Sequence, residues 1–201
     1  MNSDVSFSIV STIMVQNKHE HIKGRVLDVG CGAKPYKRLF YDKIAGEYGN
    51  GVTEWVGLDV RPVGELQGSV TEIPAEDGLF DTVLCVDTLS YVFDVQTAFS
   101  EMARVLKPGG TLVVLEPNTR GDDDRAFWGF RLKGLGALAE AFNLEVIDLQ
   151  SASRLWAGEY ENMRGSTVHG FILPPEFGGY MDAMDEKYPN ISVLVATKPL
   201  T

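Results

Sequence analysis

The sequence predicts an α/β fold built on a largely parallel sheet, and three observations lead to this class. Residues 25–40 pass from a buried-strand run through two glycines into apolar residues at helical spacing. Further along the chain, short apolar runs mostly alternate with amphipathic helical patterns. At 201 residues, the chain has the usual size of one domain with a sizeable core. We therefore expect a single domain over residues 1–201.

The N-terminal residues 1–22 are expected to form a short helix packed on the fold. Four apolar side chains recur there at roughly helical spacing, namely Val5, Ile9, Ile13 and Met14. A flap that covers the substrate is the alternative. His19 and His21 follow in a polar run, and we interpret these two histidines as surface residues rather than as a metal site.

The composition limits the partners of the chain. The formal net charge is −10 and no basic stripe is present, which disfavours nucleic acid because phosphate contacts need lysine and arginine. No apolar run is long enough to span a membrane, and the N-terminus lacks a signal-peptide pattern. Cys31 and Cys85 are too few for a disulfide framework or a zinc site. We expect a cytoplasmic protein that binds no metal and acts on a small molecule.

The stretch Arg25–Phe40, reading RVLDVGCGAKPYKRLF, predicts a strand, a glycine turn and a helix. Gly30 and Gly32 let the backbone approach a ligand closely, because neither carries a Cβ. Pro35 suits the first turn of the helix, whose free N–H groups would point into the crevice above the strand. The pattern predicts a nucleotide-type cradle. A dinucleotide fingerprint needs a third glycine where Pro35 stands, so a nicotinamide-dependent oxidoreductase is disfavoured.

A second candidate for ligand binding is the run Trp55–Asp59, WVGLD, a short apolar strand that ends in a carboxylate. Ligands of doubly wound sheets bind beyond the carboxyl ends of the strands, where Asp59 could accept both hydroxyls of a ribose. A strand-end aspartate is also common in turns. The linker Val60–Glu65 is too short for a crossover helix, so the usual second helix before Leu66–Val70 should be reduced or missing.

The middle of the chain predicts a strand, a helix and a further strand. Thr82–Val86 is apolar, and Cys85–Asp87 lie at its carboxyl end. Apolar residues from Val95 to Leu106 recur at helical spacing and predict an amphipathic helix. This helix should stop at the KPGG run that follows Leu106, because proline and glycine cannot continue it. Thr111–Glu116 is expected to be the next buried strand.

The polar loop Asn118–Arg125 comes at a strand's carboxyl end, and hence at the mouth of the predicted site. Asp122–Asp124 within it are interpreted as capping and solvating residues rather than metal ligands. A helix over Leu132–Phe142, a strand over Leu144–Leu149 and a last strand over Ile191–Lys198 are expected to follow.

The segment of residues 151–188 has the least regular pattern in the chain. A stretch of this length is either a lid over the acceptor site or an irregular insertion on the core. Together with the loop of residues 118–130, it is rich in aromatic residues and glycines. We expect Trp128, Trp156 or Tyr160 to form walls of an acceptor pocket.

Three runs of the sequence together resemble the class I S-adenosylmethionine-dependent methyltransferases of the small, single-domain type. The run LDVGCG resembles motif I, with Asp28 as its acidic lead-in, and the segment Ile73–Asp81 resembles the "lP…FD" segment. The run RVLKPGGTLVVLEP is similar to a further signature of the family. The resemblance covers roughly Val26–Val146 and implies a Rossmann-like, doubly wound, seven-stranded, mostly parallel sheet with an antiparallel last strand.

The resemblance also implies a cofactor, S-adenosyl-L-methionine, with S-adenosyl-L-homocysteine as product. Asp28 and the turn from Gly30 to Gly32 would hold the methionine part, Asp59 the ribose, and Ser69 with Val70 the adenine. The residues implied to bind the cofactor are Asp28, Gly30, Cys31, Gly32, Asp59, Val60, Ser69, Val70, Cys85 and Asp87. Ser69 stands where the family often has an aspartate.

A departure from the family pattern bears on catalysis. Ser90 and Tyr91 stand where the family often has a glutamate–histidine pair, which removes the most obvious general base. Asp87 and Tyr91 remain as candidate catalytic residues, because they lie where the acceptor should arrive. The implied function is methyl transfer to a small-molecule acceptor, linked to a glycan or a metabolite. The alternative is a non-catalytic module that binds S-adenosylmethionine.

Overall fold

The structure is a computed structural model, and it describes residues 18–33, 37, 51–118, 124–151, 167–168, 171–172 and 191–200. Most of the expected N-terminal helix, the helix after the glycine turn except for its residue Lys37, and most of the segment of residues 151–188 lie outside the described residues. Lys37 is helical, and His19–His21 form a 3₁₀ helix, η1. The prediction of a single domain over residues 1–201 stays a prediction.

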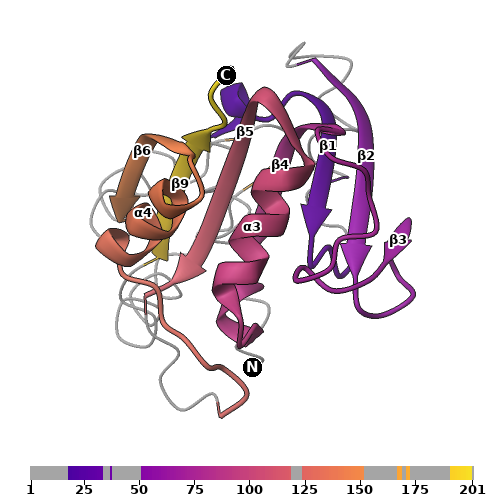
Figure 1. Ribbon diagram of the computed structural model, residues 1–201. Coiled ribbons are helices and arrows are strands. Elements are labelled where there is room, and N and C mark those ends of the chain that lie inside the picture. Colours follow the sequence, from indigo (N-terminus) through magenta and orange to yellow (C-terminus); the bar gives the residue numbers. More distant parts are fainter. Residues whose placement is uncertain are drawn as a thin grey trace.

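A seven-stranded sheet in the order β3-β2-β1-β4-β5-β9-β6 forms the centre of the molecule (Figure 1). Its strands are β1 (Gly24–Val29), β2 (Val52–Asp59), β3 (Leu66–Gln67), β4 (Phe80–Val86), β5 (Leu106–Pro117), β6 (Glu145–Ser151) and β9 (Ile191–Thr197). The neighbouring pairs from β3 to β5 are parallel, whereas β9 is antiparallel to both β5 and β6. The expected fold class is therefore confirmed. A separate two-stranded sheet joins β7 (Thr167–Val168) and β8 (Phe171–Ile172).

The helix α3 (Val95–Val105) runs across the face of the sheet that is turned to the viewer in Figure 1. Asp94 caps its start, because the carboxylate accepts a hydrogen bond of 3.0 Å from the Thr97 N–H. The predicted apolar stripe is buried against the sheet, and it consists of Ala98, Phe99, Met102 and Val105. The second helix, α4 (Leu132–Ala141), covers β6 and β9 on the same face.

The strand β5 begins earlier than the sequence predicts. The expected strand starts at Thr111, but Leu106 already pairs with Phe80 of β4, and the register shifts before Thr82 pairs with Thr111. The KPGG run therefore ends the helix, as expected, and lies in the irregular first part of the strand. The early start of β5 is explained by its pairing with β4, a contact that local sequence does not reveal.

The connection between β2 and β3 contains no helix, as the short linker predicts. Of the expected stretch Leu66–Val70, only Leu66 and Gln67 are strand, and they pair in parallel with the last two residues of β2. Glu65 holds the linker in place, because its carboxylate accepts a 2.6 Å hydrogen bond from the Gly57 N–H. The carboxyl end of β2 consequently lies beside a short loop rather than under a helix.

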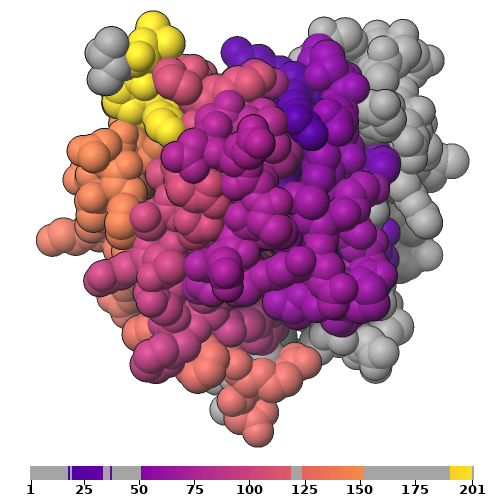
Figure 2. All heavy atoms as spheres, turned by 45° about the vertical axis from the view of Figure 1, so that its right-hand side comes forward, coloured from indigo at the N-terminus to yellow at the C-terminus, as the bar shows by residue number. Residues whose placement is uncertain are grey.

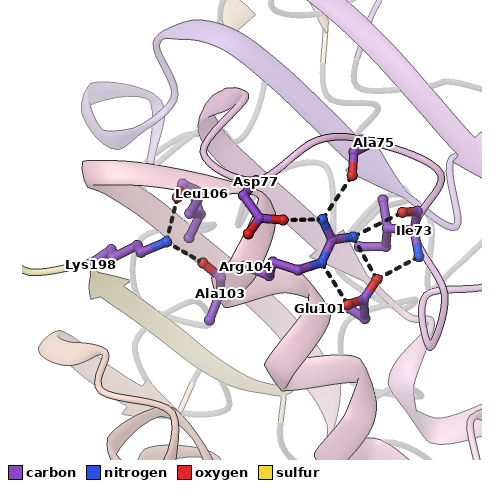
Figure 3. Close-up of polar contacts among 8 residues, drawn as sticks. All are labelled: Ile73, Ala75, Asp77, Glu101, Ala103, Arg104, Leu106 and Lys198. Atoms are coloured by element: carbon purple, nitrogen blue, oxygen red, sulfur yellow. Dashed lines mark hydrogen bonds and ion pairs between the residues drawn. The ribbon is translucent and has the colours of Figure 1, made fainter.

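Arg104, on helix α3, binds the segment that precedes β4 (Figure 3). Its guanidinium forms ion pairs of 2.7 Å with Glu101 and Asp77, and it donates to the carbonyl oxygens of Ile73 and Ala75 at 3.0 and 2.8 Å. The cluster lies at the C-terminal end of α3, next to the start of β5. It stabilises the end of the sheet opposite to the one where ligands of this fold class bind.

Candidate functional site

Four strands end side by side at one edge of the sheet, where β1, β2, β4 and β5 stop at Val29, Asp59, Val86 and Pro117. In Figure 1, the arrowheads of β1, β2 and β5 point toward this lower edge. The chain order reverses between β1 and β4, and ligands of open α/β sheets bind in the crevice at such a switch point. The residues predicted to bind a cofactor follow these strands.

The glycine turn after β1 has the conformation that its sequence predicts. Gly30 and Gly32 have φ values of 69° and 49°, in the left-handed region that favours glycine. The Gly30 and Cys31 N–H groups donate to the Leu58 carbonyl oxygen of β2 at 2.8 and 3.1 Å. A Cβ at Gly30 would overlap the Thr88 hydroxyl, whereas one at Gly32 would meet nothing closer than 3.7 Å. Gly30 is therefore packed against the turn after β4, and Gly32 borders open space.

Asp59 joins this glycine turn to the loop after β2. One carboxylate oxygen accepts a 3.0 Å hydrogen bond from the Gly32 N–H. The Arg61 guanidinium donates to both oxygens at 3.1 and 3.2 Å, and the Arg61 N–H donates at 2.9 Å. Burial alone would raise the pKa of Asp59, but the hydrogen bonds from Arg61 and Gly32 outweigh it, so the pKa lies below its ordinary value. Sequence reasoning predicted Asp59 as a ligand residue but missed Arg61 as its partner.

Asp28 is buried within the sheet rather than exposed in the crevice. Its carboxylate accepts a 3.2 Å hydrogen bond from the indole N–H of Trp55 on the neighbouring strand β2. Cys31, in the turn itself, is also buried. Both side chains are therefore shielded from solvent, and their predicted roles toward the methionine part of a cofactor stay predictions.

The other predicted cofactor residues differ in their access to solvent. Val60, directly after Asp59, is exposed. Ser69 is half-buried, and its hydroxyl shares a 2.7 Å hydrogen bond with that of Thr71. The side chains of Val70 and Cys85 lie in the core. Burial raises the pKa of the Cys85 thiol well above its ordinary value, so this group stays neutral.

The turn after β4 carries the two candidate catalytic residues. Asp87 has a φ of 51°, which is uncommon for a residue other than glycine. Its N–H donates to the Leu115 carbonyl oxygen at 3.0 Å, so the turn stays against β5. Leu89–Tyr91 form a 3₁₀ helix, η3, and the Arg125 guanidinium lies 5.6 Å from the centre of the Tyr91 ring. Asp87 and Tyr91 are both partly exposed at the crevice edge.

Glu116, near the end of β5, is a residue whose importance sequence reasoning missed. Its carboxylate is fully buried and accepts hydrogen bonds from the N–H groups of Thr88, Leu89 and Ser90 and from the Ser90 hydroxyl. Burial raises its pKa to about 7, although these hydrogen bonds favour the charged form. The sequence did contain a signal for this role, because Glu116 ends a run of apolar residues that are expected to be buried. A buried carboxylate needs hydrogen-bond donors.

Three aromatic side chains, which we call the aromatic rim, lie beside this turn: Phe93, Phe127 and Trp128. Their exposed fractions are 72%, 57% and 42%. The two phenylalanine rings meet edge to face at 5.5 Å, and the Trp128 indole N–H donates to the Val92 carbonyl oxygen at 2.9 Å. Residues 124–130 project from the lower edge of the molecule in Figure 2. Trp128 was predicted as a pocket wall, whereas Trp156 and Tyr160 lie outside the described residues.

In the part of the chain that the structure describes, no three His, Cys, Asp or Glu side chains gather in a way that could hold a metal ion. Within the predicted acidic run Asp122–Asp124, only Asp124 is described, and it is exposed. No helix among the described residues is long and apolar enough to cross a membrane.

Comparison with known proteins connects this geometry to a family. Residues 27–114 match the family model described as a methyltransferase domain. A demethylmenaquinone methyltransferase from Mycolicibacterium gilvum is 39% identical over 101 residues, which cover 48% of this chain and 44% of that protein. The chain spans about half the length of the curated relatives that it matches.

Two solved structures share the fold over most of the chain. Phosphoethanolamine N-methyltransferase 2 from Haemonchus contortus, in complex with S-adenosyl-L-methionine, has a TM-score of 0.60 at 17% identity and covers 94% of this chain and 52% of its own. The [4+2]-cyclase SpnF has a TM-score of 0.63 at 20% identity, with coverage of 96% and 81% respectively. At these identities the likeness shows the fold alone.

Proposed function

We propose that this chain, which belongs to the class I S-adenosylmethionine-dependent methyltransferases, binds S-adenosyl-L-methionine over the glycine turn and transfers its methyl group to a small-molecule acceptor. One observation carries the proposal: the Asp59 carboxylate holds the left-handed Gly32 turn at the switch point of the sheet. A turn with an open glycine, next to a charged, hydrogen-bond-accepting carboxylate, suits a ligand that combines a ribose with a charged amino acid part. The related Haemonchus contortus fold was solved with this cofactor.

The residues present fit the cofactor. Asp59 would accept the ribose hydroxyls, once the exposed Arg61 side chain exchanges its place with them. The backbone at Gly32 would face the methionine part, because Gly32 carries no Cβ and borders open space. Asp28 and Cys31, which are both buried, would border the turn. Val60, Ser69 and Val70 would border the adenine, and Cys85 and Asp87 would close the crevice from the side of β4.

When bound, the cofactor supplies an electrophilic methyl group: its carbon–sulfur bond breaks, the electron pair stays on sulfur, and the acceptor's nucleophile binds the methyl carbon and releases a proton. Most of what remains for the protein is to align the acceptor and exclude water. Asp87 and Tyr91 lie at the crevice edge where a released proton could be accepted. Their roles are proposals.

The acceptor class is the finer part of the proposal. The Mycolicibacterium gilvum relative is named for a quinone substrate, which favours a quinone-type acceptor over the glycan-linked one that the sequence resemblance first suggested. The exposed aromatic rim, with Trp128 as a wall, supports this choice because a planar apolar ring stacks well on aromatic side chains. The predicted cytoplasmic location stays a prediction.

A second candidate function is a non-catalytic module that binds the cofactor. Ser90 and Tyr91 replace the glutamate–histidine pair, and Ser90 is buried with its hydroxyl bound to Glu116 rather than directed at the crevice. The [4+2]-cyclase SpnF also shows that proteins of this fold carry names other than methyltransferase. Turnover distinguishes the two candidates.

The experiment combines calorimetry with a transfer assay. We expect S-adenosyl-L-homocysteine to bind the purified protein, and the label of methyl-labelled S-adenosyl-L-methionine to move to demethylmenaquinone in its reduced form. Binding without transfer to this acceptor or to a panel of small phenols, catechols and sugars would favour the non-catalytic module. The absence of cofactor binding would contradict the proposal as a whole.

A further inference from the structure

Glu116 has no role in the function proposed so far, although it is a buried carboxylate with four hydrogen-bond donors. It accepts from the Thr88 and Leu89 N–H groups at 2.7 Å each, from the Ser90 N–H at 3.2 Å and from the Ser90 hydroxyl at 2.7 Å. Thr88 and Leu89 follow β4, whereas Glu116 belongs to β5. Four donors from one short turn thus meet one carboxylate from a different strand.

Glu116 takes the place of the missing helix cap of η3. The first N–H groups of a helical turn have no partner within the helix, and the N-cap side chain usually satisfies one of them. Here the N-cap residue Thr88 makes no such bond. Its hydroxyl instead donates to the carbonyl oxygens of Val29 and Val86, at 3.2 and 3.0 Å. The shape of the turn from Thr88 to Tyr91 therefore depends on Glu116.

The same contact extends to the aromatic rim through Ser90. The Ser90 carbonyl oxygen accepts from the Phe127 and Trp128 N–H groups at 2.8 and 3.3 Å. Ser90 is therefore bound to Glu116 by its N–H and hydroxyl and to the rim segment by its carbonyl oxygen. A displacement of the turn would move the backbone of Phe127 and Trp128 with it.

We propose that Glu116 is a positioning residue for the acceptor: its buried carboxylate holds the turn that carries Asp87 and Tyr91 and, through Ser90, holds the aromatic rim in the arrangement that receives the acceptor. This inference rests on the proposed function, because it assigns the turn and the rim to the acceptor side of a methyltransferase. It requires no contact between Glu116 and the acceptor.

Protonation of Glu116 gives the positioning role a pH dependence. The neutral Cys85 thiol of β4 interacts electrostatically with Glu116 and also with the Asp28 carboxylate of β1. The uncharged Ser192 of β9 pairs with Glu116, and Asp87 directly precedes the donor residue Thr88. The pKa of Glu116 is about 7 in the closed turn, and it would return toward the ordinary value of 4.5 if the turn opened to water. The closed turn therefore binds the proton more tightly, so opening becomes easier as the pH rises from 5 to 8.

Hydrogen exchange tests the proposal, with Glu116→Ala, Glu116→Gln and, as control, Glu140→Ala on the exposed surface of α4. In Glu116→Ala, we expect amide exchange at residues 88–91 and 127–128 to accelerate at least tenfold, while residues 24–32 keep the wild-type rate. Glutamine retains one oxygen acceptor, which can serve the Thr88 and Leu89 N–H groups, and its NH2 group faces Ser90 as the O–H of the protonated acid would. Glu116→Gln should therefore restore part of the protection and remove its dependence on pH between 5 and 8.

Two further measurements separate positioning from cofactor binding. The Kd of S-adenosyl-L-homocysteine should change less than twofold in both variants, and the KM for reduced demethylmenaquinone should rise at least fivefold in Glu116→Ala.

Uniformly faster exchange across the sheet, unchanged exchange in the turn, or a pH profile that Glu116→Gln leaves intact would overturn the proposal. If Glu116→Ala does not fold, the Glu116→Gln and wild-type pH profiles decide. Failure of the wild type to bind S-adenosyl-L-homocysteine would instead remove the proposed function, and the exchange result would still test the link between Glu116 and the rim.

Discussion

Asp59 and Glu116 are two carboxylates at the same edge of the sheet, and each accepts backbone N–H groups from the turn that follows a neighbouring strand. Asp59, at the end of β2, binds the Gly32 N–H of the turn after β1. Glu116, at the end of β5, binds the first N–H groups of the turn after β4. Both carboxylates thus bind a turn of the neighbouring strand, but their surroundings are opposite, since Asp59 has the exposed Arg61 guanidinium as a partner and Glu116 is fully buried among neutral donors.

This difference favours different uses for the two groups. The pKa of Asp59 lies below its ordinary value, so it is charged at neutral pH, and its Arg61 partner can move into water at little cost. The pKa of Glu116 is about 7, and its donors are three backbone N–H groups and the Ser90 hydroxyl of one turn. Asp59 is therefore suited to exchange its partner for a ligand, whereas Glu116 is suited to hold the protein itself.

The largest expected effect concerns the contact between the two turns, where Gly30 packs against Thr88. In Gly30→Ala, a Cβ would overlap the Thr88 hydroxyl, which is held by two carbonyl oxygens. Overpacking and left-handed strain together should lower the free energy of unfolding by about 3–5 kcal/mol, as measured by urea denaturation.

Gly51→Ala is the matched control for Gly30→Ala. Gly51 has a φ of 74°, close to the 69° of Gly30, but an added Cβ would meet nothing within 4 Å. This variant should lose only the strain of about 1–2 kcal/mol. Equal losses in the two variants would show that the contact between the turns contributes nothing.

A second expected effect is an opposite pH dependence of stability for the two carboxylates. The folded pKa of Asp59 is lowered, so its contribution is present above its unfolded pKa, near 4, and is lost as the pH falls below it. The folded pKa of Glu116 is raised from 4.5 to about 7, so its contribution is complete below 4.5 and is lost as the pH rises through 7. The Glu116 term amounts to at most about 3 kcal/mol.

Urea unfolding of the wild type and Glu116→Gln at pH 5 and pH 8 measures this term. The unfolding free energy of the wild type, minus that of the variant, should be smaller at pH 8 than at pH 5. Glu140→Gln, at an exposed position on α4, should show no such change. A difference that stays constant, or grows with pH, would contradict the raised pKa of Glu116.

The smallest expected effect is the change in cofactor affinity when the Arg61 side chain, the partner of Asp59, is removed. If Arg61 occupies the carboxylate that the ribose needs, Arg61→Ala should tighten the binding of S-adenosyl-L-homocysteine up to about fivefold, because an exposed ion pair contributes at most about 1 kcal/mol. Arg131→Ala removes the same charge from an exposed position at the start of α4, and should leave the Kd unchanged. Weaker binding in Arg61→Ala would mean that Arg61 contacts the cofactor instead of competing with it.

Local sequence predicted the positions of the glycine turn and of Asp59, whose roles toward a cofactor stay predictions. The two glycines after a buried strand located the turn, and a carboxylate at a strand end, in a fold with a switch point, located Asp59. The missing helix before Leu66 followed from the length of the linker. These features depend on residues within one short segment, or on the general geometry of α/β sheets.

The role of Glu116 could not be predicted from local sequence, because it depends on contacts between residues far apart in the chain. Glu116 meets Thr88 and Leu89, which precede it by 28 and 27 residues, and the meeting follows from the pairing of Val86 with Leu115 in the sheet. In the sequence, Glu116 reads as the last residue of a buried strand. The early start of β5 was missed for the same reason, because the pairing of Leu106 with Phe80 is a tertiary contact.

The most direct test of the account is calorimetric titration of S-adenosyl-L-homocysteine into the wild type, Asp59→Ala and Glu116→Gln. Loss of hydrogen bonds to a charged group should weaken binding to Asp59→Ala by about 1.5–3 kcal/mol, while Glu116→Gln should bind within twofold of the wild type. Circular dichroism of each variant should match that of the wild type, so that the comparison concerns folded protein. Unchanged affinity in folded Asp59→Ala, or a loss in Glu116→Gln as large as the one expected for Asp59→Ala, would contradict the division of the site into a cofactor side and an acceptor side.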